Sequence, residues 1–212
     1  CPRRKPDGKT LVSPQHPDSE DALEKATVER FAKMGFETAN LYHETFAPHS
    51  SHGRETSAEV VFKPRLSKAI ERLNPDLPAD VVERSIEEFC ADRSALNPVI
   101  ANREVHSTLK NGLPVSWRNK DGEECSDRVR FIDWEKPDNN EFFLAQQMWI
   151  SGEVYNKRCD LLLFVNGIPL VFIELKKSGV NVKHAYDDNL RDYKNNTIPQ
   201  LWWYNGFIIL SN

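Results

Sequence analysis

The chain has 212 residues, of which 39% are hydrophobic and 28% are charged, and its formal net charge at pH 7 is −4. This length suits one large domain or two small ones and allows a substantial hydrophobic core. The acidic balance argues against a broad nucleic-acid-binding surface, and no apolar run reaches the roughly 20 residues that a membrane-spanning helix requires. The first ten residues are polar and basic, so we expect no signal peptide.

The four cysteines are widely separated in the sequence and form no Cys-x-x-Cys pair; they are Cys1, Cys90, Cys125 and Cys159. This spacing is not that of a zinc site or of a disulfide framework. We therefore expect a reduced, cytoplasmic protein.

The N-terminal part begins with a lead-in over residues 1–17. Its Gly8–Thr10 matches the end of a phosphate-binding loop, but the earlier glycine of that loop is absent and Pro14 follows where a helix should start, so no nucleotide site is expected. A helix is predicted to begin at Ser19, which can cap it ahead of two acidic residues, and to end at Gly35.

Three further helices are predicted at 59–73, 79–91 and 98–110, followed by short strands at 113–118 and 127–134. Together they make residues 18–135 a helix-rich N-terminal part of a single domain over 1–212. Two groups of side chains in this part could bind ligands: His43, His49 and His52 in a loop, and Lys63, Arg65, Lys68 and Arg72 along one helix. We interpret the first as solvated loop histidines and the second as a solvated helix face, with a phosphate-contacting patch as the alternative.

Residues 136–212 form the expected core. A strand is predicted at 142–150, a hairpin within "CDLLLFVNGIPLVFIELKK" (159–177), a helix at 181–194 and a strand at 206–210. The hairpin strands lack regular polar alternation, which is typical of a sheet covered on both faces. The sequence therefore predicts an α/β fold with a mixed β-sheet flanked by helices.

The register of the hairpin decides which polar groups can meet. A two-residue turn at Asn166–Gly167 sets Asp160 opposite Ile173 and sends Glu174 to the other side of the sheet. A three-residue connection with Gly167 in the left-handed conformation makes Asp160 and Glu174 diagonal neighbours on one face, with Lys176 one step further. The second arrangement gathers two carboxylates and an ammonium group, and we expect it.

Glu174 is the unusual member of this set because it lies inside an apolar run, where a carboxylate is costly unless it is paired or bound to a metal. Two carboxylates with a backbone carbonyl, that of Leu175, are oxygen ligands that suit Mg²⁺ or Mn²⁺. A lysine beside the metal, Lys176, can orient or help to deprotonate water and can stabilise charge on a phosphoryl group. The residues therefore indicate metal-assisted hydrolysis of phosphodiester bonds.

The pattern Asp160-x13-Glu174-x-Lys176 resembles the PD-(D/E)xK nuclease motif, and its surroundings resemble the nuclease domain of type I restriction enzyme R subunits. The resemblance extends over nearly the whole chain, through "RLSKAIERLNPDLP", "NPVIANREVHSTLKNGLPV", "IDWEKPDNNEFFLAQQ" and "YKNNTIPQLWWYNGFIILSN". It implies a restriction-endonuclease-like core in which Asp160, Glu174 and Lys176 are catalytic. The family's proline before the aspartate is Cys159 here, a position that ligates nothing.

The resemblance also implies further site residues. The family's Gln-x-x-x-Tyr motif on the following helix matches Asn189 and Tyr193, with asparagine in place of glutamine. From the residues alone, Asn189 is either a satisfied core amide or a group that faces the site. Many such nucleases add a glutamate from the first helix, for which Glu20, Glu24 and Glu29 are the candidates, and the sequence does not choose among them.

The same resemblance implies partners. The R subunits of this prokaryotic family cut double-stranded DNA, continue into ATP-driven motor domains, and work with modification and specificity subunits. We expect this chain to be an N-terminal nuclease domain that uses Mg²⁺ or Mn²⁺, with ATP needed only by motor domains outside it. Two alternatives stay open: a stand-alone repair or recombination nuclease with the same core, and a catalytically silent docking domain.

Overall fold

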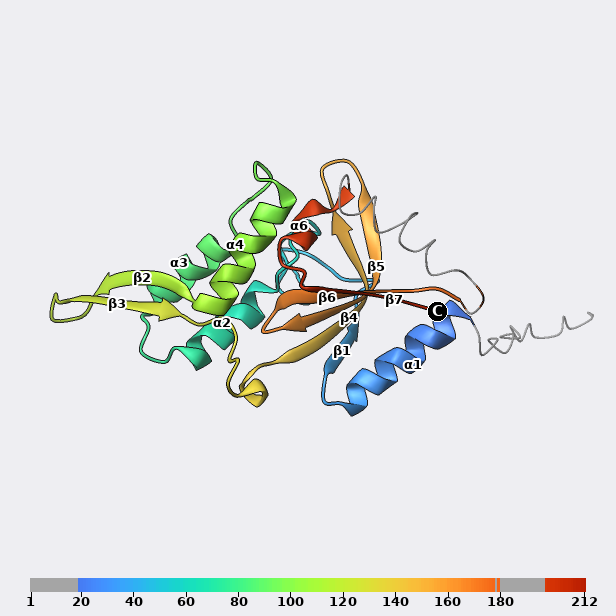
Figure 1. Cartoon of the computed structure of the whole chain (residues 1–212), viewed down its shortest axis with the longest axis horizontal. Helices are drawn as coiled ribbons and strands as arrows, with labels where there is room; N and C mark the ends of the chain where they lie inside the picture. The colour runs from blue at the N-terminus through green and yellow to red at the C-terminus, as the bar shows by residue number, and fades with distance from the viewer. Residues whose placement is uncertain (1–18, 178, 180–196) are drawn as a thin grey trace, which may run out of the picture.

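The computed structural model describes residues 19–177, 179 and 197–212 and shows a mixed β-sheet between two sets of helices (Figure 1). In chain order its elements are α1 (Glu20–Lys33), β1 (Glu37–Asn40), α2 (Lys63–Leu73), α3 (Ala79–Phe89), α4 (Pro98–Asn111), β2 (Leu113–Arg118), β3 (Glu124–Val129), the 3₁₀ turn η1 (Pro137–Asn139), β4 (Phe142–Ser151), β5 (Asn156–Val165), β6 (Ile168–Leu175), α6 (Pro199–Trp202) and β7 (Phe207–Ser211).

Five strands form the main sheet, in the order β1-β4-β5-β6-β7. The three central strands β4, β5 and β6 are antiparallel to one another, whereas β1 runs parallel to β4 and β7 runs parallel to β6. Strands β2 and β3 form a separate hairpin that projects beside α2, α3 and α4 (Figure 1). The expected mixed sheet with flanking helices is confirmed.

Among the described residues, helix α1 is the helix that covers one face of the sheet, and it begins and ends where its sequence predicts. The Ser19 hydroxyl accepts a hydrogen bond from the Ala22 amide, and Glu20 and Asp21 occupy the first turn, which complements the helix dipole. The chain leaves the helix at Gly35, whose φ of 93° few other residues adopt. This placement directs the acidic first turns of α1 toward one end of the sheet.

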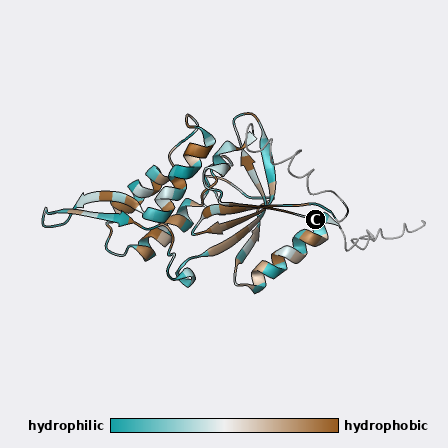
Figure 2. Cartoon of the chain, in the orientation of Figure 1, coloured by the Kyte–Doolittle hydropathy of each residue, from teal (hydrophilic) through white to brown (hydrophobic). Residues whose placement is uncertain are grey.

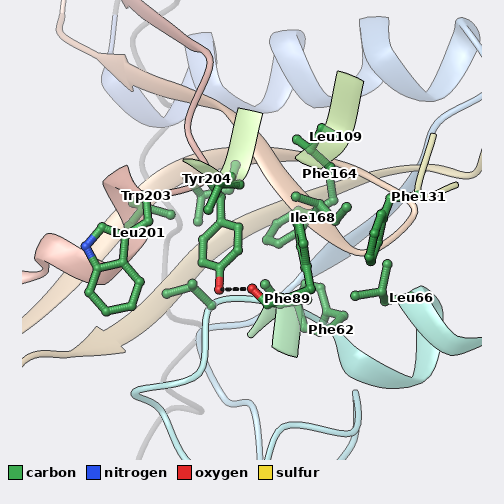
Figure 3. Packing of buried hydrophobic residues seen from close by; sticks show 14 of the residues in the cluster. Phe62, Leu66, Phe89, Leu109, Phe131, Phe164, Ile168, Leu201, Trp203 and Tyr204 are labelled. Atoms are coloured by element: carbon green, nitrogen blue, oxygen red, sulfur yellow. Dashed lines mark hydrogen bonds between the residues drawn. The ribbon is translucent and has the colours of Figure 1, made fainter. Parts of the chain in front are cut away.

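The larger core lies between the sheet and helices α2, α3 and α4. Phe62 and Phe164 pack at a centroid distance of 4.7 Å, and Phe89 stacks on Phe131 at 4.4 Å. Tyr204 donates a hydrogen bond from its hydroxyl to the Phe89 carbonyl at 3.3 Å (Figure 3). Figure 2 shows the hydrophobic colour concentrated along the central strands.

A smaller cluster fills the space beneath α1. Its buried members are the strand residues Leu144, Leu161, Leu163, Ile173 and Leu175, against which Leu23, Val28 and Phe31 pack from α1 and Phe36 from the segment that follows it. Membership of the two clusters therefore reports which face of the sheet each strand residue occupies.

Several predicted boundaries need correction. The second helix begins at Lys63, four residues after its expected start, because Val60, Val61 and Phe62 enter the core as an irregular segment. The strand expected at 127–134 is Glu124–Val129 and pairs with β2 across a tighter turn. The short strand β1 and helix α6 were not predicted, and the helix expected at 181–194 lies outside the described residues. In the part of the chain that the structure describes, none of the helices has the length and apolar character of a membrane span.

Candidate metal-dependent nuclease site

The hairpin of β5 and β6 turns through two residues, so the expected three-residue turn is wrong. Val165 pairs with Ile168, and Asn166 and Gly167 both have positive φ, at 52° and 80°. A β-bulge then changes the register: Phe164 pairs with Pro169, whereas the pair before it joins Leu163 to Val171. The extra residue lies in β6 and not in the turn.

This bulge brings the two expected carboxylates together. Leu161 pairs with Ile173, so Asp160 and Glu174 are the next residues of their strands. The Leu175 amide donates a hydrogen bond to Asp160 Oδ2 at 3.0 Å, which takes the place of a ladder bond where the two strands part. We call this place, formed by Asp160, Glu174 and Leu175, the fork.

Asp160 and Glu174 reach the fork from different sides of the sheet, and not from one shared face as the bulged turn predicted. Ile173 and Leu175 pack beneath α1, so the alternating side chain of Glu174 lies toward the larger core, where the pKa of Cys159 is raised by burial and then by the Glu174 charge. Asp160 instead lines a cavity on the α1 side. The two side chains nevertheless lie close enough for the charge of Glu174 to act on Asp160.

The two carboxylates are electrostatically coupled. Burial, followed by the charge of Glu174, raises the pKa of Asp160 to about 6, and the Leu175 hydrogen bond opposes this rise. Glu174 is only 3% exposed. Holding both groups ionised at neutral pH is therefore costly without a nearby positive charge.

Lys176 supplies part of that charge. Its Nζ lies 2.8 Å from Glu174 Oε1. Burial acts to lower the pKa of Lys176, but the hydrogen bond and charge of Glu174 outweigh it and the pKa is raised. The ammonium group therefore stays protonated at neutral pH, which favours charge stabilisation over proton abstraction as its chemical role.

Helix α1 contributes acidic residues on the other side of the fork. Glu20 accepts a hydrogen bond from the Lys177 amide at 3.1 Å, and Glu24 accepts one from Gln147 Nε2 at 2.6 Å. Burial and the Asp160 charge raise the pKa of Glu24, whereas the Gln147 bond lowers it. Glu29 is exposed at the cavity wall. Of the three candidates from the sequence, Glu24 is thus half-buried, bonded and close enough to Asp160 to feel its charge.

The cavity beside Asp160 has a volume of about 490 Å³. Five of its lining side chains are acidic and two are basic; they are Glu20, Asp21, Glu24, Glu29 and Asp160, with Lys25 and Arg158. The guanidinium of Arg158 lies over the rings of Tyr42 and Trp149, at 5.6 and 5.9 Å from their centroids. A cavity with this excess of carboxylates attracts cations and repels phosphates unless a cation is bound.

The sequence did not point to Gln147 or Arg158. In the sequence, Gln147 is an ordinary polar residue of a predicted strand. Its hydrogen bond to Glu24 depends on its positive φ, which no sequence pattern predicts. Arg158 stands two residues before Asp160, on the same strand. That spacing was a usable signal, because side chains two apart on a strand often share a face.

The remaining candidates from the sequence are two residues of a predicted helix, three loop histidines and a basic helix face. Asn189 and Tyr193 lie outside the described residues. Among the residues that are described, no three or more histidine, cysteine, aspartate or glutamate side chains are arranged as a metal site, and this includes the three loop histidines. The basic helix face is largely engaged: Lys63 pairs with Glu59, and Arg65 pairs with Glu37 and Glu141.

The residues at the fork fit a hard divalent cation. Mg²⁺ is typically held by one or two carboxylates and completes its shell with water and substrate phosphate. Asp160 and Glu174 supply two carboxylates, and the Leu175 amide points at Asp160. Because the N–H and C=O of one residue in an extended strand point the same way, the Leu175 carbonyl is directed into the fork as well.

Comparison with known proteins shows the family to which the chain belongs. Residues 17–212 match the family model described as type I restriction enzyme R protein N terminus. The chain is 30% identical over 200 residues, 92% of its length, to the type I restriction enzyme HindI endonuclease subunit of Haemophilus influenzae. It is 30% identical over 104 residues, 49% of its length, to the type I restriction enzyme SsaAORF53P endonuclease subunit of Staphylococcus saprophyticus. The matches span 18% and 10% of the lengths of these two relatives.

Proposed function

We propose that this chain, which belongs to the family of type I restriction enzyme R protein N termini, hydrolyses phosphodiester bonds of double-stranded DNA with the help of Mg²⁺ or Mn²⁺. One observation carries the proposal: a buried carboxylate, Glu174, and a second carboxylate with a raised pKa, Asp160, meet beside a protonated lysine. A carboxylate whose pKa is raised by burial and by a second carboxylate, beside a cavity, is the kind of perturbed group that clusters at functional sites.

Asp160, Glu174 and the Leu175 carbonyl would hold the cation. When bound, a divalent cation polarises a phosphoryl oxygen and makes water a better nucleophile at neutral pH. The chain itself supplies the geometry: the Leu175 amide fixes the Asp160 carboxylate, and β6 carries Glu174 and Lys176 on the same side of the strand. Protonated Lys176 then stabilises the negative charge that develops on the phosphorus oxygens.

The acidic cavity supports a role for the cation in substrate binding as well. The phosphates of DNA would meet a cavity wall on which acidic side chains outnumber basic ones. A divalent cation is therefore needed to reverse the local charge. Arg158, held over two aromatic rings on that wall, is the basic group best placed to contact a phosphate near the scissile bond. Glu24 is the acid from α1 that we assign to the site.

The wider enzyme is part of the proposal. The Haemophilus relative is named as an endonuclease subunit of a type I restriction enzyme, and the chain matches less than a fifth of that relative. We propose that the chain acts with ATP-driven motor domains and with modification and specificity subunits in a restriction complex. The observation that speaks against a catalytically silent docking domain is the presence of Asp160 and Glu174 at the fork with Lys176 bonded to Glu174.

The test is DNA cleavage by the complete restriction complex in which the R subunit carries Asp160→Asn. The proposal predicts that double-strand cleavage is lost while ATP hydrolysis continues at the parent rate. Cleavage at the parent rate would overturn the nuclease assignment. Loss of both activities would overturn the assignment of separate nuclease and motor functions.

A further inference from the structure

Gln147 has a backbone conformation that residues other than glycine seldom adopt. Its φ is 53°, in the left-handed region, although it lies inside strand β4. Among the described residues, the other non-glycine residue with positive φ is Asn166, which occupies a two-residue hairpin turn where this conformation is normal. No turn explains Gln147. Strained conformations of this kind persist where the surrounding structure holds them, and they cluster at functional sites.

The left-handed residue changes which side chains of β4 face α1. Ala145 belongs to the larger core, so regular alternation would place Gln147 in that core as well. Instead Met148 occupies the core position, and Gln146 and Gln147 both line the cavity on the α1 side. The alternation of β4 side chains between the two faces of the sheet thus shifts by one residue at Gln147.

The side-chain alternation of strand β5 shifts as well, at the residue opposite Gln147. Gln146 pairs with Leu161 and Met148 pairs with Cys159, so Gln147 lies opposite Asp160. Leu162 and Cys159 both belong to the larger core, although they are three positions apart in the strand, and Asp160 therefore lines the α1-side cavity instead of entering the core. The left-handed conformation of Gln147 and the position of Asp160 on the α1 side therefore occur at residues that lie opposite each other on neighbouring strands.

From this position the side chain of Gln147 bonds to helix α1. Its Nε2 donates a hydrogen bond to Glu24 Oε2 at 2.6 Å, which links strand β4 to helix α1 across 123 residues of sequence. Glu24 is half-buried on the same cavity wall as Asp160. Two carboxylates on one wall repel each other, and a neutral amide donor is the group that can hold one of them in place without neutralising it.

We propose that Gln147 is a positioning residue of the nuclease site: its left-handed backbone turns Asp160 toward α1, and its carboxamide holds Glu24 beside Asp160. The inference rests on the proposed function, because it takes Asp160 as a metal ligand. Groups that orient metal ligands through hydrogen bonds commonly change metal affinity by about 10–100-fold when they are removed.

The test is a calorimetric titration of this chain with Mn²⁺, without DNA. The variants are Gln147→Gly and Gln147→Asn. Both residues accept a left-handed φ, but glycine has no carboxamide and the asparagine carboxamide is one methylene too short to reach Glu24. We expect both variants to keep the parent's circular dichroism spectrum and to bind Mn²⁺ about tenfold more weakly. Gln200→Asn, which shortens an amide that donates to the Ser151 carbonyl at 2.8 Å and does not line this cavity, is the matched control and should change the affinity less than twofold.

Coupling to Glu24 separates positioning from a general structural effect. In a Glu24→Gln background, Gln147→Gly should weaken Mn²⁺ binding no further, because the group that Gln147 holds is already altered. Parent-like affinity in both Gln147 variants, or a loss that simply adds to that of Glu24→Gln, would overturn the inference. If the Gly variant fails to fold, the Asn variant decides. If Asp160→Asn binds Mn²⁺ as tightly as the parent does, the proposed function is wrong, and the inference that rests on it is wrong as well.

Discussion

The Leu175 amide donates a hydrogen bond to Asp160 at 3.0 Å, so the carboxylate of one strand completes the backbone ladder of its neighbour. This bond locates Asp160 at the place where β5 and β6 separate. It also brings Asp160 close enough to Glu174 for the charge of one group to change the titration of the other. The chemistry of the site follows from that proximity.

Asp160 should make the stability of the metal-free chain depend on pH. Its pKa is raised from 3.8 to about 6, so the folded state holds the proton more tightly than the unfolded state does. The resulting stabilisation is complete below about pH 3.8 and is lost as the pH rises through 6, a change of about 3 kcal/mol. Urea denaturation between pH 4 and 7 measures it. In Asp160→Asn this part of the slope should disappear, and an unchanged slope would contradict the raised pKa.

Lys176→Ala should abolish DNA cleavage by the complete enzyme, with a loss of about 10²–10³ in rate, because one positioned donor of charge stabilisation is removed. Lys176→Arg should not restore cleavage, since a planar guanidinium does not fit the place of an ammonium beside Glu174. The matched control is Lys177→Ala, whose exposed side chain points to the other side of the strand. If Lys177→Ala stops cleavage while Lys176→Ala cuts normally, our assignment of the two lysines is reversed.

Glu24 and Glu29 should respond differently to the same change. Glu24→Gln removes a half-buried carboxylate on the Asp160 wall and should slow cleavage about tenfold or more. Glu29→Gln alters an exposed residue of the same helix and should cut at the parent rate. The measurement is the single-turnover rate of DNA cleavage by each of the two variants. Equal effects of the two substitutions would contradict the choice of Glu24.

Much of the site follows from local sequence, and the part that does not depends on contacts distant in the chain. The apolar run around Glu174 and the Asn166–Gly167 turn predict a hairpin with a costly carboxylate, and the hairpin is present. Pro169, next to the bulge in β6, was a usable signal, because proline within sheets is confined largely to edges, first residues and bulges. The hydrogen bond of Gln147 to Glu24 was not predictable, because it joins residues that lie 123 positions apart.

The same contrast holds for the fold. Helices α1, α3 and α4 have clear apolar periodicity, breakers and caps, and their boundaries were predicted within about two residues. Strand β1 has only four residues, and its parallel pairing with β4 is fixed by the sheet and not by its own composition. Tertiary pairing, rather than propensity, makes it a strand.

Asn166 ties the hairpin turn to the rest of the domain. Its Nδ2 donates hydrogen bonds to the Phe131 carbonyl and to Asn140 Oδ1, both at 2.8 Å, and its Oδ1 accepts one from the Glu141 amide. Asn166→Asp replaces the donor by an acceptor facing two oxygens and should lower the free energy of unfolding by about 3 kcal/mol.

Asn111→Asp is the matched control for this change. Asn111 is exposed at the end of α4, so the same substitution should cost no more than about 0.5 kcal/mol. Denaturant unfolding of both variants gives the comparison. Equal losses in the two variants would contradict the role of Asn166 in holding the turn.

The most direct test of the central claim, that Asp160 and Glu174 hold one divalent cation together, is a double-mutant cycle on Mn²⁺ affinity in this chain. Asp160→Asn, Glu174→Gln and the combined variant are compared with the parent by calorimetry. Because a shared ion loses its site when either carboxylate is removed, we predict that each single variant loses nearly as much affinity as the double variant. Parent-like binding in either single variant, or losses that add as for two independent sites, would contradict the shared site.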